Sequence, residues 1–303
     1  MPLKIEPVTT DFTAIASGLD LREPIDADTA AEIEAAMDEY AVLVWHDQPL
    51  DDDQHMAFTR WFGPLDPGLV SVTKRGSRFR QAGFVDIANV DNNGDILARD
   101  HRSVTGSIAN QFWHTDSSFM QTVAKYSLLS AAVVPDEGGD TEFADLRAAY
   151  DALPDDLRGI VADLTGEHHA LYSRSLLGND YTEAEMALIP PAQWPLVRSH
   201  PATGRKILFT PIHISRILGM SVPESRMLVN ELIEHATRPQ FVYRHKWRAG
   251  DLVMWDNRCT LHRGRRFDLT QRRDLRRTTT METDRPGRHQ ADTLVAASGD
   301  SRD

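Results

Sequence analysis

Between about Phe84 and Thr280, short apolar segments alternate with residues that favour a turn. The apolar segments are rich in β-branched and aromatic residues, as strands are. We expect strands at residues 84–90, 126–134, 141–144, 168–172, 196–200, 207–209, 241–245, 252–255 and 275–280. Many short strands with turns between them predict a β-sandwich or jelly roll.

Helices are expected outside these strands, because apolar residues recur at helical spacing in four places. These are residues 26–40, 51–62, 146–163 (broken at Pro154) and 222–237. Asp28 and Thr29 are candidate caps of the first helix, and the apolar run at 41–45 is typical of a buried strand. The predicted fold class is therefore mainly β with flanking helices.

Neither an internal repeat nor a linker divides the chain, so we expect one domain over residues 1–283. Residues 284–303 are polar and lack periodicity, which predicts a disordered tail. The N-terminus lacks the apolar segment of a secretory signal, and no apolar run approaches the roughly 20 residues that span a bilayer. We therefore expect a cytoplasmic protein.

The composition narrows the classes of partner. A formal net charge of −12 argues against non-specific binding to nucleic acid or to an anionic membrane. A chain this acidic that binds a small anion must concentrate positive charge locally. Its single cysteine, Cys259, excludes an internal disulfide and a cysteine-based zinc site.

His114 and Asp116 form the first candidate site. Side chains two apart on a strand point the same way, so both can approach one ion. Two histidines and one carboxylate are the ligand set of a facial Fe(II) site with open coordination positions. With 12 histidines in the chain, about one His-x-Asp arises by chance. The pair alone therefore fits equally well with two solvated residues on a surface strand.

The other histidine has to come from elsewhere, and His262 is the candidate. It follows residues 250–258, which have the pattern of a turn, an apolar strand and a second turn. A histidine just past a buried strand and its turn is well placed to reach into the mouth of a barrel. A lone histidine there is more often structural.

Four arginines fall within residues 272–277, where such a cluster usually marks a solvated face. If a strand begins near Arg273, then Arg273 and Arg277 share one face of it. Two buried guanidinium groups are costly without anionic partners, but they are suited to binding two carboxylates. Upstream, Gly138 and Gly139 permit a tight turn that leads into Thr141, although an ordinary turn explains that segment equally well.

Together these elements resemble the taurine/2,4-D dioxygenase family of Fe(II)- and 2-oxoglutarate-dependent oxygenases. The motifs keep the order and separations of the family pattern from the N-terminal helices to about Thr283. They are residues 113–116, 138–141, 250–257 and 261–263 and the pair Arg273/Arg277. Within the family, residues 255–277 are most similar to the 2,4-dichlorophenoxyacetate (aryloxyalkanoate) dioxygenases.

The resemblance implies a double-stranded β-helix (jelly-roll) core and a role for each matching residue. Iron would be held by His114, Asp116 and His262. The cosubstrate 2-oxoglutarate would be bound by Thr141 and Arg273, with Trp255 lining its pocket. The substrate would be bound by Arg277, with Asn110 and His213 as further candidates; a structural role fits His213 equally well. For His200, His235 and His245 we favour a structural role.

The resemblance also implies a reaction on a small anionic substrate. O₂ and 2-oxoglutarate would be consumed, and the carbon next to the ether oxygen of an aryloxyalkanoate would be hydroxylated. The products would be a phenol and glyoxylate, with succinate and CO₂. The same chemistry on taurine, an alkylsulfonate or a sulfate ester stays open, because arginine binds sulfonate as readily as carboxylate.

Two readings from other classes also stay open. A zinc hydrolase can use the same three ligands, but it leaves Thr141 and Arg273 without a purpose. A non-catalytic jelly roll that binds a small acid leaves the ligands themselves unexplained. Residues 173–192 are a candidate mobile loop over the site. Members of the family usually self-associate, so we expect a homo-oligomer.

Overall fold

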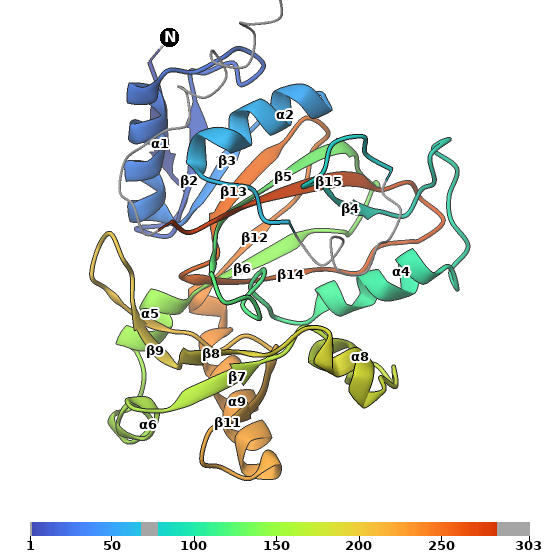
Figure 1. Ribbon diagram of the computed structural model, residues 1–303. Coiled ribbons are helices and arrows are strands. Elements are labelled where there is room, and N and C mark those ends of the chain that lie inside the picture. Colours follow the sequence, from blue (N-terminus) through green and yellow to red (C-terminus); the bar gives the residue numbers. More distant parts are fainter. Residues whose placement is uncertain (1, 68–77, 284–303) are drawn as a thin grey trace, which may run out of the picture.

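A seven-stranded sheet with the order β1-β2-β3-β13-β5-β15-β4 is the largest layer of the protein. The computed structural model describes residues 2–67 and 78–283 (Figure 1). The strands of this sheet are β1 (Lys4–Pro7), β2 (Thr13–Ser17), β3 (Val42–Trp45), β13 (Leu252–Asp256), β5 (Ala124–Val133), β15 (Asp274–Met281) and β4 (Val85–Ala88). All neighbours in it are antiparallel except β2 and β3.

A second, three-stranded antiparallel sheet has the order β12-β6-β14. Its strands are β12 (Val242–His245), β6 (Thr141–Asp145) and β14 (Thr260–Gly264). It faces the large sheet: the ring centroids of Phe143 on β6 and Trp255 on β13 are 5.4 Å apart. Two facing antiparallel sheets with helices outside confirm the predicted fold class.

The sequence of β13 shows how the large sheet is covered on both sides. Leu252 and Met254 pack in one hydrophobic cluster with α1 (Ala27–Tyr40) and α2 (Asp52–Thr59). Val253 and Trp255 pack in the other cluster, between the two sheets. Because alternate residues of a strand point to opposite faces, a strand covered on both faces is a continuous apolar run.

Two smaller sheets, the long helix α9 (Val222–Ala236) and several short helices are the other elements of the described residues. The sheets are β11-β7-β8 (Ile214–Ile217, Thr165–His168, Ala192–Pro195) and β10-β9 (Lys206–Leu208, Val197–Ser199). The helices are η1 (Arg60–Phe62), α4 (Arg102–Ser107), η2 (Ile108–Gln111), α5 (Leu146–Asp151), α6 (Asp155–Val161), α7 (Tyr172–Ser175), α8 (Glu183–Ala187), α9 (Val222–Ala236) and η3 (Pro239–Phe241). Figure 1 shows the β11-β7-β8 sheet and α9 below the two main sheets.

Most expected elements are present, and the exceptions have local causes. The strand predicted at 168–172 is wrong, since β7 ends at His168 and α7 begins at Tyr172. The first helix is capped by Asp26, whose carboxylate accepts a bond from the Thr29 N–H, and not by Asp28 or Thr29. Strands β1, β2, β8, β11 and β14 were not predicted, because each is short and mixes polar with apolar residues.

Residues 173–192, predicted as a mobile loop, contain most of α7, all of α8 and the first residue of β8. Their mobility stays a prediction. The tail predicted at 284–303 lies outside the described residues.

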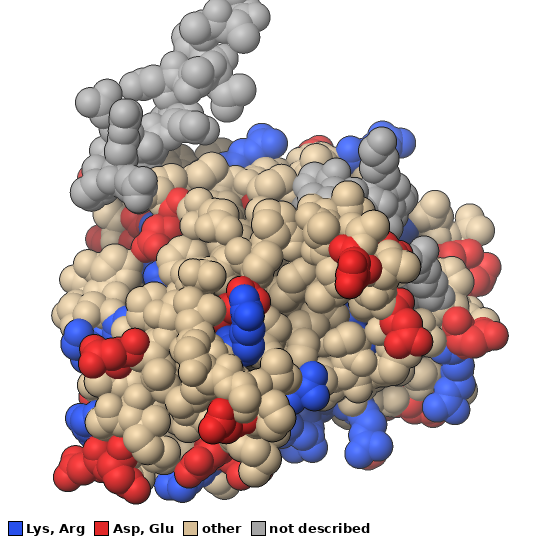
Figure 2. All heavy atoms as spheres, turned by 60° about the horizontal axis from the view of Figure 1, so that its bottom comes forward, with Lys and Arg blue, Asp and Glu red and all other residues tan. Residues whose placement is uncertain are grey.

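Charged side chains on the face in Figure 2 lie in small groups, with Lys and Arg close to Asp and Glu. No broad basic patch is visible on that face. Across the described residues, no helix has both the length and the apolar character needed to cross a membrane.

The buried imidazole of His55 predicts acid sensitivity. Its Nδ1 lies 2.9 Å from Ser130 Oγ, and its Nε2 lies 2.9 Å from Thr278 Oγ1. Burial, reinforced by the charge of Arg276, lowers the pKa of His55 from 6.5 to about 3. The unfolded chain therefore binds a proton below pH 6.5 that the folded protein does not, so stability is lost as the pH falls.

We expect urea unfolding to measure this loss directly. Between pH 7 and pH 5 the wild type should lose about 2 kcal/mol more of its unfolding free energy than His55→Gln does. Equal losses in the two proteins would show that His55 is not held neutral.

Candidate functional site

A main-chain bridge brings His114 and His262 together. His262 lies on β14, and His114 lies in the extended segment that follows η2. The N–H of His114 donates to the His262 carbonyl at 3.0 Å, and the reverse bond is 2.7 Å. Residues directly opposite each other in an antiparallel pair project their side chains to the same face. The two rings are therefore adjacent, with centroids 4.2 Å apart.

Asp116 completes a buried group with these histidines. One ligand atom from each of the three side chains lies within 4.8 Å of the other two. Asp116 Oδ2 is 3.8 Å from His262 Nε2. Asp116 lies in a turn and not, as expected, on a strand, so the bend of the chain after His114 brings its carboxylate to the histidines.

Charge and burial set the protonation of the group. Burial lowers the pKa of His114 and lowers that of His262 well below its usual value. Burial alone would raise the pKa of Asp116, but the positive charge of Arg277, helped by a hydrogen bond from Ser127, keeps this pKa below its usual value. The group is therefore two neutral imidazoles and one carboxylate, which are the protonation states that bind metal ions.

The tautomer of His114 also suits a metal ion. Its Nδ1 donates to the Phe112 carbonyl at 2.8 Å, which leaves the lone pair on Nε2 free. His262 Nδ1 is buried and has no hydrogen-bond partner within the described part of the chain. Two imidazoles and one carboxylate fit Fe(II), because three donors on one side leave the other coordination positions open.

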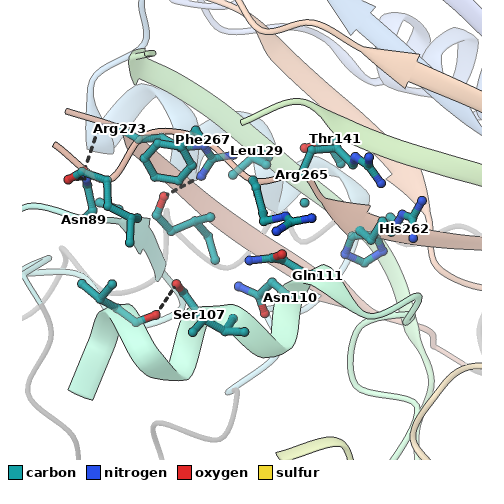
Figure 3. A pocket seen from close by; sticks show the side chains of 18 of the residues that line it. Asn89, Ser107, Asn110, Gln111, Leu129, Thr141, His262, Arg265, Phe267 and Arg273 are labelled. Atoms are coloured by element: carbon teal, nitrogen blue, oxygen red, sulfur yellow. Dashed lines mark hydrogen bonds between the residues drawn. The ribbon is translucent and has the colours of Figure 1, made fainter. Parts of the chain in front are cut away.

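A cavity of about 830 Å³ opens beside the two histidines. Most of the predicted site residues line it: Asn110 of η2, His114 after η2, Thr141 of β6, Trp255 of β13, His262 of β14, Arg273 just before β15 and Arg277 within β15. Figure 3 shows Asn110 and Gln111 on one side of this cavity and Thr141 on the other, with His262 near them. His213 is not among the lining residues. Its ring packs edge-on against His114 and Phe119, which favours the structural role.

Arg273 is a buried cation at the far side of the cavity. Its guanidinium donates to the carbonyls of Ile87 and Gly139, both at 3.1 Å. Burial lowers its pKa from 12.5 to about 10. It forms no ion pair with a carboxylate of the described residues. Asp140 acts on its charge without bonding the guanidinium, and a buried cation of this kind is suited to an anionic ligand.

The predicted turn before Thr141 shapes the same end of the cavity. Gly139 has a φ of +70°, which favours glycine, and a Cβ there would lie 3.1 Å from Arg273 Nε, so the guanidinium would have to shift by a few tenths of an ångström. Thr141 Oγ1 accepts a bond from Trp247 Nε1 at 3.0 Å. The hydroxyl proton of Thr141 therefore stays available to a ligand in the cavity.

The arginines of β15 divide between two faces as expected. Arg277 lines the cavity and forms an ion pair with Asp116. Arg276 points the other way, to Asp52 and the Leu50 carbonyl. Arg277 therefore places a positive charge beside both the cavity and the histidines.

Two residues at the site were given no role from the sequence. Ser127 Oγ contacts Asp116 Oδ2 at 2.6 Å, and Asn257 Oδ1 accepts a bond from the Asp116 N–H at 3.1 Å. No motif marks Ser127, because only the pairing of β5 with β13 and β15 brings it here. Asn257 ends the motif at 250–257, which was its only signal.

A second buried group, His200, Asp256 and Cys259, has its ligand atoms equally close. Here the carboxylate of Asp256 is already bound by His200 at 3.0 Å and by Arg258 at 2.6 Å. Arg258 binds both oxygens of this carboxylate, and burial raises the pKa of the Cys259 thiol well above its usual value, so the thiol stays protonated. A structural role is therefore favoured, as expected for His200. His245 and His235 likewise bind protein acceptors, Asp251 and the Ala149 carbonyl.

The contrast between the two groups gives a matched test. Removing His262 should weaken Mn²⁺ binding by at least about 100-fold, because a facial site loses one of three ligands. His200→Asn, at an equally buried position, should leave the affinity unchanged. Titration of free Mn²⁺ measured by electron paramagnetic resonance compares the two, and equal affinities would contradict the site.

Residues 4–279 match the model of the protein family described as "Taurine catabolism dioxygenase TauD, TfdA family". The chain is 54% identical over 283 residues to the alpha-ketoglutarate-dependent 2,4-dichlorophenoxyacetate dioxygenase of Cupriavidus pinatubonensis, covering 93% of this chain and 99% of that protein. It is 39% identical to the (S)-phenoxypropionate/alpha-ketoglutarate-dioxygenase of Sphingobium herbicidovorans, over 89% of this chain and 91% of that protein.

Among solved structures, the crystal structure of AAD-2 in complex with Mn(II) and N-oxalylglycine superposes with a TM-score of 0.86. The two chains are 47% identical, and the match covers 94% of this chain and 98% of the other. The jelly-roll prediction is thereby confirmed. The chain belongs to the taurine catabolism dioxygenase TauD, TfdA family, whose members are 2-oxoglutarate-dependent non-haem iron dioxygenases.

Proposed function

We propose that this enzyme hydroxylates an aryloxyalkanoate such as 2,4-dichlorophenoxyacetate at the carbon next to the ether oxygen. The hydroxylated product collapses to a phenol and glyoxylate. The main supporting observation is the cavity, whose lining combines the two histidines, seven arginines (Arg273 and Arg277 among them) and an apolar wall. The 54% identity to a relative named for this substrate supports the proposal.

In this proposal His114, Asp116 and His262 hold Fe(II). Bound iron supplies the activation of O₂, coupled to the decarboxylation of 2-oxoglutarate to succinate and CO₂. The protein binds and orients the reactants. Asp116 provides the one negative charge among the ligands, and the Phe112 carbonyl keeps the lone pair of His114 Nε2 directed at the metal position.

The carboxylate of 2-oxoglutarate farthest from iron binds Arg273 and Thr141. Both lie at the same end of the cavity, one as a buried cation and one as a hydroxyl donor. A bidentate bond from the guanidinium to a carboxylate would replace the missing counter-ion of Arg273. Trp255 lies against His262, with ring centroids 4.7 Å apart, and lines the pocket of the cosubstrate.

The carboxylate of the substrate binds Arg277, which lies beside Asp116 and therefore beside the metal position. This places the adjacent carbon of the substrate next to the oxidising centre, and such positioning is the main contribution of the protein to the rate. The aryl ring lies against the apolar wall, and Asn110 provides a polar contact in the same cavity. The wall consists of Ile87, Val104, Ile108, Leu129, Phe267 and Leu269.

The other readings fit the cavity less well. Taurine and small alkylsulfonates would leave its apolar wall unoccupied, since pockets of this size bury ligands of drug-like dimensions. A zinc hydrolase needs a general base, but Asp268, which is exposed, is the only acid among the described residues that line the cavity. A protein that binds a small acid without metal does not require three buried ligand side chains.

Separate truncation of the two arginines tests the division of roles. Arg277→Ala should raise the KM for the aryloxyalkanoate by roughly 100-fold, because a buried charge pair is lost, and change the KM for 2-oxoglutarate much less. Arg273→Ala should do the reverse. Steady-state succinate formation gives both constants, and equal effects on the two substrates would refute the assignment.

The substrate class is tested with the iron-loaded enzyme, 2-oxoglutarate and O₂. Succinate should rise with aryloxyacetates or aryloxypropionates, with an equal amount of phenol released. Succinate formation with taurine alone would support the iron- and 2-oxoglutarate-dependent reaction and contradict the proposed substrate class.

A further inference from the structure

The side chain of Asn257 lies at the centre of the contacts that support Asp116. It is fully buried in the turn that follows β13. Its Oδ1 accepts bonds from the main-chain N–H of Asp116 at 3.1 Å and from Trp255 Nε1 at 3.0 Å. Both of these partners can only donate, so the atom that faces them must be the amide oxygen.

The other end of the amide is fixed by the same reasoning. Asn257 Nδ2 lies 2.9 Å from Ser127 Oγ, and an amide nitrogen can only donate. Thr115 contributes on the main-chain side, since its hydroxyl donates to the Asn257 carbonyl at 2.7 Å. Asn257 therefore connects Thr115 and the main chain of Asp116 to Trp255 and Ser127 of the large sheet.

The hydroxyl of Ser127 has a single possible arrangement of hydrogen bonds. Asp116 is a carboxylate paired with Arg277, so it only accepts, and Ser127 must give it its one proton at 2.6 Å. Ser127 then has only lone pairs left, which accept from Asn257 Nδ2 and from Thr279 Oγ1 at 2.9 Å. The one donor and both lone pairs of Ser127 Oγ are thereby used, so its hydroxyl has no alternative arrangement.

We propose that Asn257 and Ser127 are positioning residues that hold the carboxylate of Asp116 in one orientation toward the metal. Asn257 fixes the main chain of Asp116, and Ser127, itself oriented by Asn257, fixes carboxylate oxygen Oδ2. The other oxygen, Oδ1, is held by Arg277.

The physical reason for this role is the number of coordination positions that Asp116 would occupy on the metal. A carboxylate free to rotate can bind a metal through both oxygens and so occupy an additional position. The proposed chemistry needs three open positions, two for the keto acid and one for O₂. With each oxygen already accepting a bond from the protein, rotation would break at least one buried hydrogen bond, which is costly. This inference rests on the ligand role proposed for Asp116.

Metal affinity tests the inference without turnover. Ser127→Ala removes the donor to Asp116, and Asn257→Leu removes the amide at similar volume. Each should raise the dissociation constant of Mn²⁺ by about 10- to 100-fold, as loss of groups that orient metal ligands generally does. In the iron-loaded enzyme, both should also form more succinate per phenol released, because a misplaced oxidant is less well coupled to the substrate.

Ser130→Ala is the matched control. Ser130 is an equally buried serine on β5 whose hydroxyl contacts His55 and not the site. Its variant should have the Mn²⁺ affinity and the succinate-to-phenol ratio of the wild type. If Asn257→Leu does not fold, Ser127→Ala decides the question alone.

Asp116→Ala separates failure of this inference from failure of the proposed function. If Asp116→Ala abolishes Mn²⁺ binding while Ser127→Ala and Asn257→Leu bind like Ser130→Ala, the positioning role is overturned and the metal site stands. If Asp116→Ala binds Mn²⁺ like the wild type, the proposed metal site itself is wrong, and the positioning role is overturned with it.

Discussion

The pair of main-chain hydrogen bonds between His114 and His262 is the contact on which the rest of the site depends. It joins the segment after η2 to β14 and places two imidazoles side by side. Strand β14 is in turn paired with β6, so the same sheet that presents His262 also presents Thr141. Backbone pairing has a fixed geometry, and this makes it a more accurate support for ligands than flexible side chains would be.

The distribution of charge is the second constraint. The chain carries a net charge of −12, yet its cavity is lined by arginines and one acid. Arg273 is held among carbonyls without a carboxylate partner, which costs stability in the free protein. Gly139, which has a positive φ, lies directly against that cation. Stability is thus lowered at the position where an anion would be bound, and the anion would restore it.

Much of the fold and of the candidate site could be predicted from residue types and their spacing. The continuous apolar run of β13 and the placement of Arg273 and Arg277 on one face, opposite Arg276, follow from the period of a strand, which is the same in every protein. The three proposed ligands could be predicted because imidazole and carboxylate side chains bind metal ions, and because the order and separations of these residues match one family pattern. His262 was expected just beyond a strand but lies within β14, since five residues of mixed polarity do not look like a strand.

By itself, the sequence determined the fold class, the candidate ligands and the need for locally concentrated positive charge, because these follow from the chemistry and local order of residues. Tertiary structure decided the contacts that the local order of residues does not determine. It placed Ser127 beneath Asp116, assigned His213 to packing against His114, and gave the cavity its size and apolar wall. Each of these depends on contacts between strands far apart in the chain, and such contacts exist only once the two sheets have packed together.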